Sequence, residues 1–175
     1  MGEEFSYLHE ERQTLETLVS KYGDALVRFA YCYTKNADAA EDIAEDAFVA
    51  LFLKKKRFLQ ESQLKAYLYR AVKNRCVDYL RARRRAPASL SDLEAVLAGD
   101  DLSRTIEDRC EAQTLYRCMQ ALPPQYGNVL YLSYFEGYSP DEIAALLRQN
   151  KKQVYNALAR AKTALSKLLE QEGIS

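Results

Sequence analysis

The stretch L-K-A-Y-L-Y-R-A-V-K-N-R-C-V-D-Y-L-R-A-R-R-R, residues 64–85, decides the fold. It contains neither Gly nor Pro, and its apolar residues recur at helical spacing, which predicts one long amphipathic helix. The opposite face carries polar and charged side chains, namely Arg70, Lys73, Asn74, Asp78, Arg81 and Arg84. We therefore expect one side to pack on protein and the other to offer hydrogen-bond donors to an anionic partner. A solvated basic face on an ordinary core helix is the alternative.

Charge is arranged in blocks along the 175 residues, although the whole chain is neutral. Residues 54–85 carry twelve Lys or Arg against two Asp or Glu, whereas residues 1–53 carry four against eleven. Residues 86–112 are again acidic, with two against seven. The basic block favours a polyanion as partner, and the separation of charge favours different partners for different faces.

Two further helices are predicted upstream of the basic stretch, over residues 11–34 and 38–53. Asp38 and Glu41 have the spacing of a capping box, which predicts Asp38 as the N-cap of the second helix. The outer face of that helix groups four residues, Asp42, Glu45, Asp46 and Val49. An acidic face of this kind is either simply solvated or a docking surface for a basic partner, where complementary charge speeds association.

Residues 54–62 break the helical periodicity and predict a loop. Its start combines cations with an aromatic ring, as Lys54, Lys55, Lys56, Arg57 and Phe58. This combination suits single-stranded nucleic acid, because cations follow the phosphates while a ring stacks on a base. The alternative is that Phe58 tucks into the core and the cations are solvated.

Downstream, residues 86–105 change composition to Pro, Ser, Gly and acids, which predicts a linker with one short helical turn over residues 92–97. We therefore expect an all-α protein of two small helical domains, residues 11–85 and 106–175. In the second domain, helices are predicted over residues 106–119, 126–135, 140–147 and from 151 onward. Ser139 and Asn150 are the predicted N-caps of the last two helices.

The last two predicted helices and the short break between them form a helix-turn-helix pattern. Such a unit places its second helix in the major groove of duplex DNA. The outward face of that helix carries the candidate contacts, which are Lys151, Lys152, Gln153, Tyr155, Asn156 and Arg160. We expect Lys152, Gln153 and Asn156 to reach bases, and Lys151 and Arg160 to contact phosphate.

The sequence offers little for catalysis or metal binding. It contains one His and four Cys without a C-x-x-C pair, so no metal or cofactor is expected and no catalytic residues are assigned. We expect the thiols to be reduced and mostly buried in a cytoplasmic protein. There is no signal peptide, no apolar run long enough to span a bilayer and no G-x-x-x-x-G-K-[ST] nucleotide motif, so the protein is predicted not to be an enzyme.

Three ordered motifs resemble the extracytoplasmic-function (ECF) sigma factors, the two-domain specificity subunits of bacterial RNA polymerase. Residues 37–52 are similar to the family's A-E-D-[IV]-x-Q-[ED]-x-F, and residues 67–81 to W-L-x-x-I-A-x-N-x-x-x-D-x-x-R. Residues 122–144 resemble L-P-x-x-x-R-x-V-x-x-L-x-x-x-E-G-x-[ST]-x-x-E-I-A. Departures include Tyr67 for Trp, Glu45 for Gln, and Tyr126-Gly127 where a basic residue is usual.

The resemblance implies a role for each charged face. The acidic helix would bind the clamp helices of the largest polymerase subunit. The loop at residues 54–62 and the polar face of residues 70–84 would open and hold the promoter −10 element, and the helix from residue 151 would read the −35 element. It also implies an inhibitory anti-sigma factor as a partner.

Three other classes of protein remain open from the residues themselves. A stand-alone helix-turn-helix regulator would explain residues 137–168 but not the charge blocks before the linker. An enzyme acting on nucleic acid is disfavoured by the missing ligand clusters. An all-helical adaptor without DNA binding is the third, and a flat salt dependence of DNA binding would favour it.

Overall fold

The computed structural model describes residues 11–54, 58, 60–85 and 110–173. In this part of the chain it contains seven α-helices, as the sequence analysis predicts. They are α1 (Glu11–Thr34), α2 (Ala37–Lys54), α3 (Glu61–Arg85), α5 (Cys110–Gln120), α6 (Pro124–Tyr134), α7 (Pro140–Leu147) and α8 (Lys151–Gln171). The predicted linker, its short helical turn and the cations Lys55, Lys56 and Arg57 lie outside the described residues.

The turn between α1 and α2 corrects one prediction. Asn36, not Asp38, caps α2, because its side-chain oxygen accepts a hydrogen bond from the Ala39 backbone N–H at 3.0 Å. The cause is Lys35, whose positive φ of 53° ends α1 and places the N-cap of α2 two residues earlier than predicted. Asp38 instead lies in the first turn, where its charge still complements the helix dipole.

The C-terminal helices (α5–α8) begin and end close to the predicted boundaries. The Tyr-rich segment forms α6, and Gly137 follows it with a φ of 70°, as expected for a glycine that ends a helix. Ser139 forms a complete capping box with Glu142 at the start of α7. Asn150 caps α8 by accepting from the Lys152 backbone N–H at 2.8 Å, so both predicted caps of the helix-turn-helix are confirmed.

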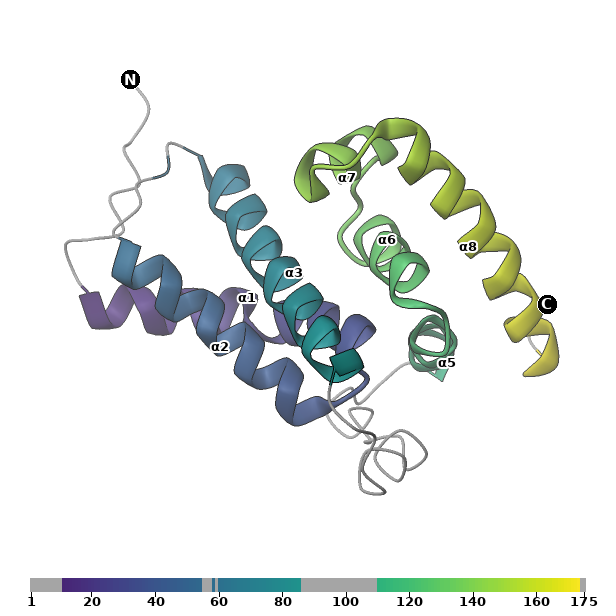
Figure 1. Ribbon diagram of the computed structural model, residues 1–175, viewed down its shortest axis with the longest axis horizontal. Helices are drawn as coiled ribbons and strands as arrows, with labels where there is room; N and C mark the ends of the chain where they lie inside the picture. The colour runs from purple at the N-terminus through teal and green to yellow at the C-terminus, as the bar shows by residue number, and fades with distance from the viewer. Residues whose placement is uncertain (1–10, 55–57, 59, 86–109, 174–175) are drawn as a thin grey trace.

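One hydrophobic core runs through both halves of the described chain. Helix α1 lies at its centre and packs on α2 and α3 on one side and on α5 and α6 on the other. Figure 1 shows the resulting arrangement, with the N-terminal helices (α1–α3) beside the C-terminal helices and α3 facing α6 and α7. The sequence leaves open whether the two halves pack together; in the structure they do.

A glycine lies where α6 packs closely against the end of α5 and against α1. A Cβ atom at Gly127 would lie 3.2 Å from the Met119 carbonyl oxygen and 3.5 Å from the Cys32 Cβ atom. The neighbouring Asn128 is also buried and donates to the Tyr33 hydroxyl. Gly127 therefore stands at a helix–helix contact, which accounts for the absence of the basic residue usual near this position.

Candidate nucleic-acid interface

The polar face of α3 contains most of the residues predicted to hold a DNA strand. Asn74, Asp78, Arg81 and Arg84 are exposed, and Asp78 and Arg81 form a long ion pair of 3.9 Å between highly exposed groups. Such a pair contributes little free energy. These four residues are therefore accessible to a partner along the second half of the helix.

Arg70 and Lys73 are in a different situation, because they contact the C-terminal helices. The Arg70 guanidinium donates to the carbonyl oxygens of Leu146 at 2.8 Å and Ala145 at 3.0 Å. The Lys73 ammonium donates to the Leu147 carbonyl at 2.7 Å. Both cations thus satisfy the last turn of α7, whose carbonyls have no partner within the helix.

Burial lowers the pKa of both cations. It lowers the pKa of Lys73 from its usual value of 10.5. Burial also lowers the pKa of Arg70, and the nearby charge of Arg148 lowers it further. In this arrangement both half-buried cations donate to carbonyls at the end of α7.

A polar hollow of about 720 Å³ lies between α2, the start of α3 and the end of α7. Cations dominate the described residues that line it, and none of these residues is a carboxylate; they include Lys54, Arg70, Lys73, Arg75 and Arg148. Phe58 lies at its edge, only 8% exposed, with its ring 5.5 Å from that of Tyr67. Of the two alternatives for Phe58, the structure has the core position.

A cluster around Glu136, just beyond α6, could not be found from the sequence pattern. Its carboxylate accepts from the Tyr69 hydroxyl at 2.7 Å and pairs with the Lys65 ammonium at 2.6 Å. The same ammonium lies 5.3 Å from the centre of the Tyr138 ring. Tyr69 and Glu136 are 67 residues apart, so no local sequence pattern predicts their contact.

The Glu136 cluster is well shielded from water. The side chain of Glu136 is 13% exposed and that of Lys65 is 27% exposed. Burial alone would lower the pKa of Lys65, but the hydrogen bond to Glu136 and the other interactions with Glu136 and Tyr138 together outweigh it, so the net pKa is raised above 10.5. Burial, Tyr131 and the Glu136 charge raise the pKa of Tyr69, so its phenol stays protonated and donates.

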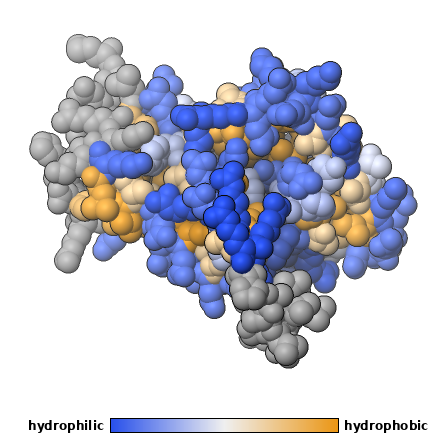
Figure 2. Space-filling model, in the orientation of Figure 1, coloured by the Kyte–Doolittle hydropathy of each residue, from blue (hydrophilic) through white to orange (hydrophobic). Residues whose placement is uncertain are grey.

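The acidic face of α2 lies on the outside of the molecule. Asp42, Glu45 and Asp46 are exposed, and Val49 is 50% exposed. An apolar surface continues along α2 through Phe52 and Leu53, and hydrophobic surface is visible at this end of the molecule in Figure 2 (left). The four residues predicted to bind a protein partner thus form one accessible surface.

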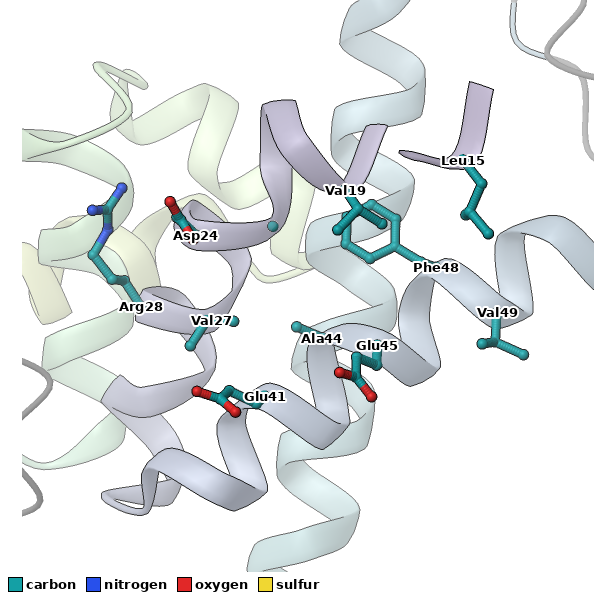
Figure 3. Close-up of a pocket in the computed structure, with 11 residues that line it drawn as sticks. Leu15, Val19, Asp24, Val27, Arg28, Glu41, Ala44, Glu45, Phe48 and Val49 are labelled. Carbon is teal, nitrogen blue, oxygen red and sulfur yellow. The ribbon is translucent and has the colours of Figure 1, made fainter. Parts of the chain in front are cut away.

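A groove of about 650 Å³ runs beside this surface, between α1 and α2. Figure 3 shows Leu15 and Val19 of α1 facing Phe48 and Val49 of α2 at one end, with Glu41 and Glu45 farther along α2. The groove thus has an apolar floor and acidic residues at its rim. These features suit the binding of an amphipathic helix that carries basic residues.

The outer face of α8 presents the remaining predicted contacts. All six of them are exposed, namely Lys151, Lys152, Gln153, Tyr155, Asn156 and Arg160. Arg148 adopts the left-handed conformation, with a φ of 53°, and so makes the tight turn between α7 and α8 without a glycine. The opposite face of the helix is buried through Val154, Leu158 and Ala161, and this packing fixes its orientation.

The described residues form neither a metal site nor a membrane-spanning helix. There, no group of His, Cys, Asp and Glu side chains could hold a metal ion. None of the helices seen in this part of the chain is long and apolar enough to cross a membrane. Cys32, Cys76 and Cys118 are free and buried, as predicted, and burial raises the pKa of the Cys32 and Cys76 thiols to about 12.

Comparison with protein families assigns both halves of the chain. A model of sigma-70 region 2 matches residues 18–86, and a model of sigma-70 region 4 matches residues 112–165. The chain is 29% identical to the RNA polymerase sigma-H factor of Pseudomonas aeruginosa, over 91% of this chain and 88% of that protein. It is 25% identical to the RNA polymerase sigma factor SigV of Bacillus subtilis, over 92% and 94% of the two chains.

Two solved structures share the fold. One is the sigma factor RpoE in complex with the anti-sigma factor NepR from Bartonella quintana, with a TM-score of 0.65 and 20% identity over 89% of this chain and 96% of that chain. The other is CnrH in complex with the cytosolic domain of CnrY, with a TM-score of 0.58 and 23% identity over 91% and 90%.

Proposed function

The chain belongs to the sigma-70 family, as an ECF-type RNA polymerase sigma factor, and from this premise we propose that it directs core polymerase to specific promoters in the cytoplasm. It would do so without catalytic chemistry of its own. The observation that carries the proposal is the order of the two family matches, which fall on the helices that bear the acidic, basic and helix-turn-helix surfaces.

We assign polymerase binding to the exposed surface of α2. Asp42, Glu45 and Asp46 supply negative charge, and Val49 supplies an apolar contact beside the groove. A basic amphipathic helix of the polymerase, such as the clamp helices of the largest subunit, fits these features. Complementary charge at such an interface raises the rate of encounter and fixes the orientation of the partners.

Strand separation at the −10 element is assigned to α3 and the preceding cationic segment. The sequence contains no nucleotide-binding motif, so the free energy for opening DNA must come from binding. Unstacking a base costs a few kcal/mol, which contacts with the separated strand would have to return. Lys54 through Arg57 would hold phosphates, while Arg70, Lys73, Asn74 and Arg81 would hold the separated strand.

Recognition of the −35 element as duplex is assigned to α8. The polar side chains in the first turns of this helix are exposed, and they suit hydrogen bonding to base edges in the major groove. Few cations accompany them, so we expect a modest salt dependence for this part of the interface. An anti-sigma factor is a further proposed partner, because the structural relative RpoE was solved with one.

Charge reversal on α2 tests the polymerase assignment. The variant Asp42→Lys/Glu45→Lys/Asp46→Lys should fail to copurify with core polymerase, because like charges would meet at the interface. Glu170→Lys/Glu172→Lys, on the exposed end of α8, is the control and should copurify as the wild type does. Equal copurification of both variants would refute the assignment.

Alanine substitution of Lys54, Lys55, Lys56 and Arg57 tests the −10 assignment. Open-complex formation on promoter DNA should fall, while binding of α8 to duplex −35 DNA should be unchanged. An equal loss of both activities would contradict the division of labour. The stand-alone helix-turn-helix regulator is disfavoured, since the match to region 2 covers the helices that such a protein would not need.

A further inference from the structure

The polar hollow between α2, α3 and the end of α7 has the size of a small-molecule site, and the proposed DNA-binding residues account for only part of its lining. Its volume of about 720 Å³ lies within the range of about 300–1,000 Å³ that is usual for such sites. Leu147 and Arg148 line it from the C-terminal half, and all its other lining residues come from the N-terminal half. The hollow is therefore complete only where α3 and α7 are in contact (Figure 1).

Positive charge is crowded in this hollow. Five cations line it, and no carboxylate does so among the described residues. The cations are Lys54, Arg70, Lys73, Arg75 and Arg148. Arg70 and Arg148 come from different halves, yet they are close enough that Arg148 adds to the effect of burial in lowering the pKa of Arg70. Like charges held together repel one another, and a cleft lined by one sign of charge concentrates counter-ions. An anion in the hollow would relieve the repulsion.

Two of the cations, Arg75 and Arg148, have side-chain donors to spare. Arg70 and Lys73 already donate to carbonyls at the end of α7. The side chains of Arg75 and Arg148, by contrast, form no hydrogen bond or ion pair with another residue in the described part of the chain. Neither is assigned to −10 or −35 binding. Each guanidinium offers a planar fork of donors that matches the oxygens of a phosphate group.

We propose that the hollow binds a compact polyphosphate anion, held between Arg148 of the C-terminal half and Arg75 of α3. A polyphosphate carries several negative charges within a short length, so it matches a hollow in which several cations are crowded together. Because it contacts both halves, it binds only the arrangement in which α3 and α7 touch, and it stabilises that arrangement by mass action. The proposal involves binding without hydrolysis, and it does not depend on how the protein binds DNA.

The polyphosphate group can belong to an inorganic polyphosphate or to a nucleotide. Tyr67 also lines the hollow, with its ring 5.5 Å from that of Phe58, and aromatic rings of this kind are the surfaces on which bases stack. Tripolyphosphate and ATP share the triphosphate group and differ in the nucleoside. Tighter binding of ATP would therefore identify a nucleotide as the ligand, and equal affinities would identify an inorganic polyphosphate.

The test is a calorimetric titration of the full chain with tripolyphosphate, and in parallel with ATP, at one fixed ionic strength and without divalent cations. Arg148→Gln is compared with Arg117→Gln, which removes one guanidinium from the exposed face of α5, outside the hollow. Arg148→Gln should weaken the binding of both anions by at least about tenfold, because it removes charge-assisted hydrogen bonds. Arg117→Gln should bind both anions as the wild type does.

Two results would overturn the inference. If the wild-type chain bound neither tripolyphosphate nor ATP, the hollow would not be a polyphosphate site. Equal affinities of Arg148→Gln and Arg117→Gln would mean that the anions bind elsewhere or through the general charge of the surface. Should Arg148→Gln not fold, Arg75→Gln makes the same comparison from α3, with the same expected loss. Neither result bears on promoter recognition, so failure of this inference leaves the proposed function standing.

Discussion

Helices α3 and α8 both carry polar, cationic faces, but the first half of the α3 face contacts the C-terminal helices, whereas the face of α8 is exposed. The Lys65 side chain of α3 is 27% exposed and paired with a shielded carboxylate, whereas Lys151 of α8 is 69% exposed and lies 3.8 Å from an exposed Asp141. Their sequences look alike in charge. The comparison teaches that a run of cations shows what a helix is able to bind, while tertiary contacts decide whether it is free to bind.

The largest effect expected from this comparison concerns the donors of α3. Arg70→Ala/Lys73→Ala should weaken binding of single-stranded DNA by at least about tenfold, because each charge-assisted hydrogen bond contributes about 1.5–3 kcal/mol. Binding of duplex DNA through α8 should not fall. Anisotropy titrations with the two kinds of DNA make the measurement. Lys152→Ala/Arg160→Ala is the matched control on α8, and it should show the reverse pattern.

The second effect concerns the packing of α6 against α5 and α1. Gly127→Ala should lower the free energy of unfolding by about 1–3 kcal/mol, since the added methyl group meets the Met119 carbonyl and the Cys32 side chain. Gly23→Ala in α1 is the control, because its new methyl group would meet only the Val19 side chain at 3.5 Å. Alanine there should stabilise α1 by up to about 1 kcal/mol.

Urea denaturation of the two glycine variants gives these free energies directly. A Gly127→Ala variant as stable as the wild type would contradict the tight packing of α6 against the Met119 carbonyl.

A third and smaller effect concerns the N-caps of α7 and α8. Ser139→Ala should cost about 1 kcal/mol, because it removes the side-chain bond to the Glu142 N–H at 3.2 Å from the capping box. Asn150→Ala should cost a similar amount, through the loss of a 2.8 Å bond. Ser166→Ala, on the exposed face of α8, serves as the neutral reference in thermal unfolding. If neither substitution changed the stability measurably, packing alone would fix the helix-turn-helix.

The smallest effect is a pH dependence at the start of α3. Hydrogen bonds from Lys21 and Tyr22 lower the pKa of Glu61 below its usual 4.5. A lowered pKa in the folded state gives stability that is complete above pH 4.5 and is lost as the pH falls through the folded value. Glu61→Gln should flatten this acid limb of a stability-versus-pH curve measured by urea denaturation. An unchanged limb would show that Lys21 does not pair with Glu61 in solution.

Much of the fold follows from the sequence because its signals are local. The predicted start and end of α1 and α7 agree with the structure, since amphipathic spacing and cap residues lie within a few positions of one another. The N-cap of α2 was predicted wrongly because Lys35 adopts a positive φ that no residue type there announces. Asn36, which does favour caps, was the signal available.

The relation between the two halves could not be predicted from the sequence. Lys65, Tyr69 and Glu136 form their cluster across a separation of 67 residues or more, and neither end carries a recognisable pattern. Tyr126-Gly127 departs from the family motif, and the sequence offers no reason for it. The structure gives the departure a physical reason, because a Cβ atom at position 127 would lie 3.2 Å from the Met119 carbonyl oxygen. The residues assigned to polymerase, −10 and −35 binding remain predictions.

Run-off transcription tests the central claim most directly. Core polymerase alone and core polymerase with the purified chain are given the same library of genomic fragments, and the 5′ ends of the transcripts are mapped. We predict new, discrete start sites that appear only with the chain and share one −10 and one −35 sequence. A pattern of transcripts identical to that of core polymerase alone would contradict the account.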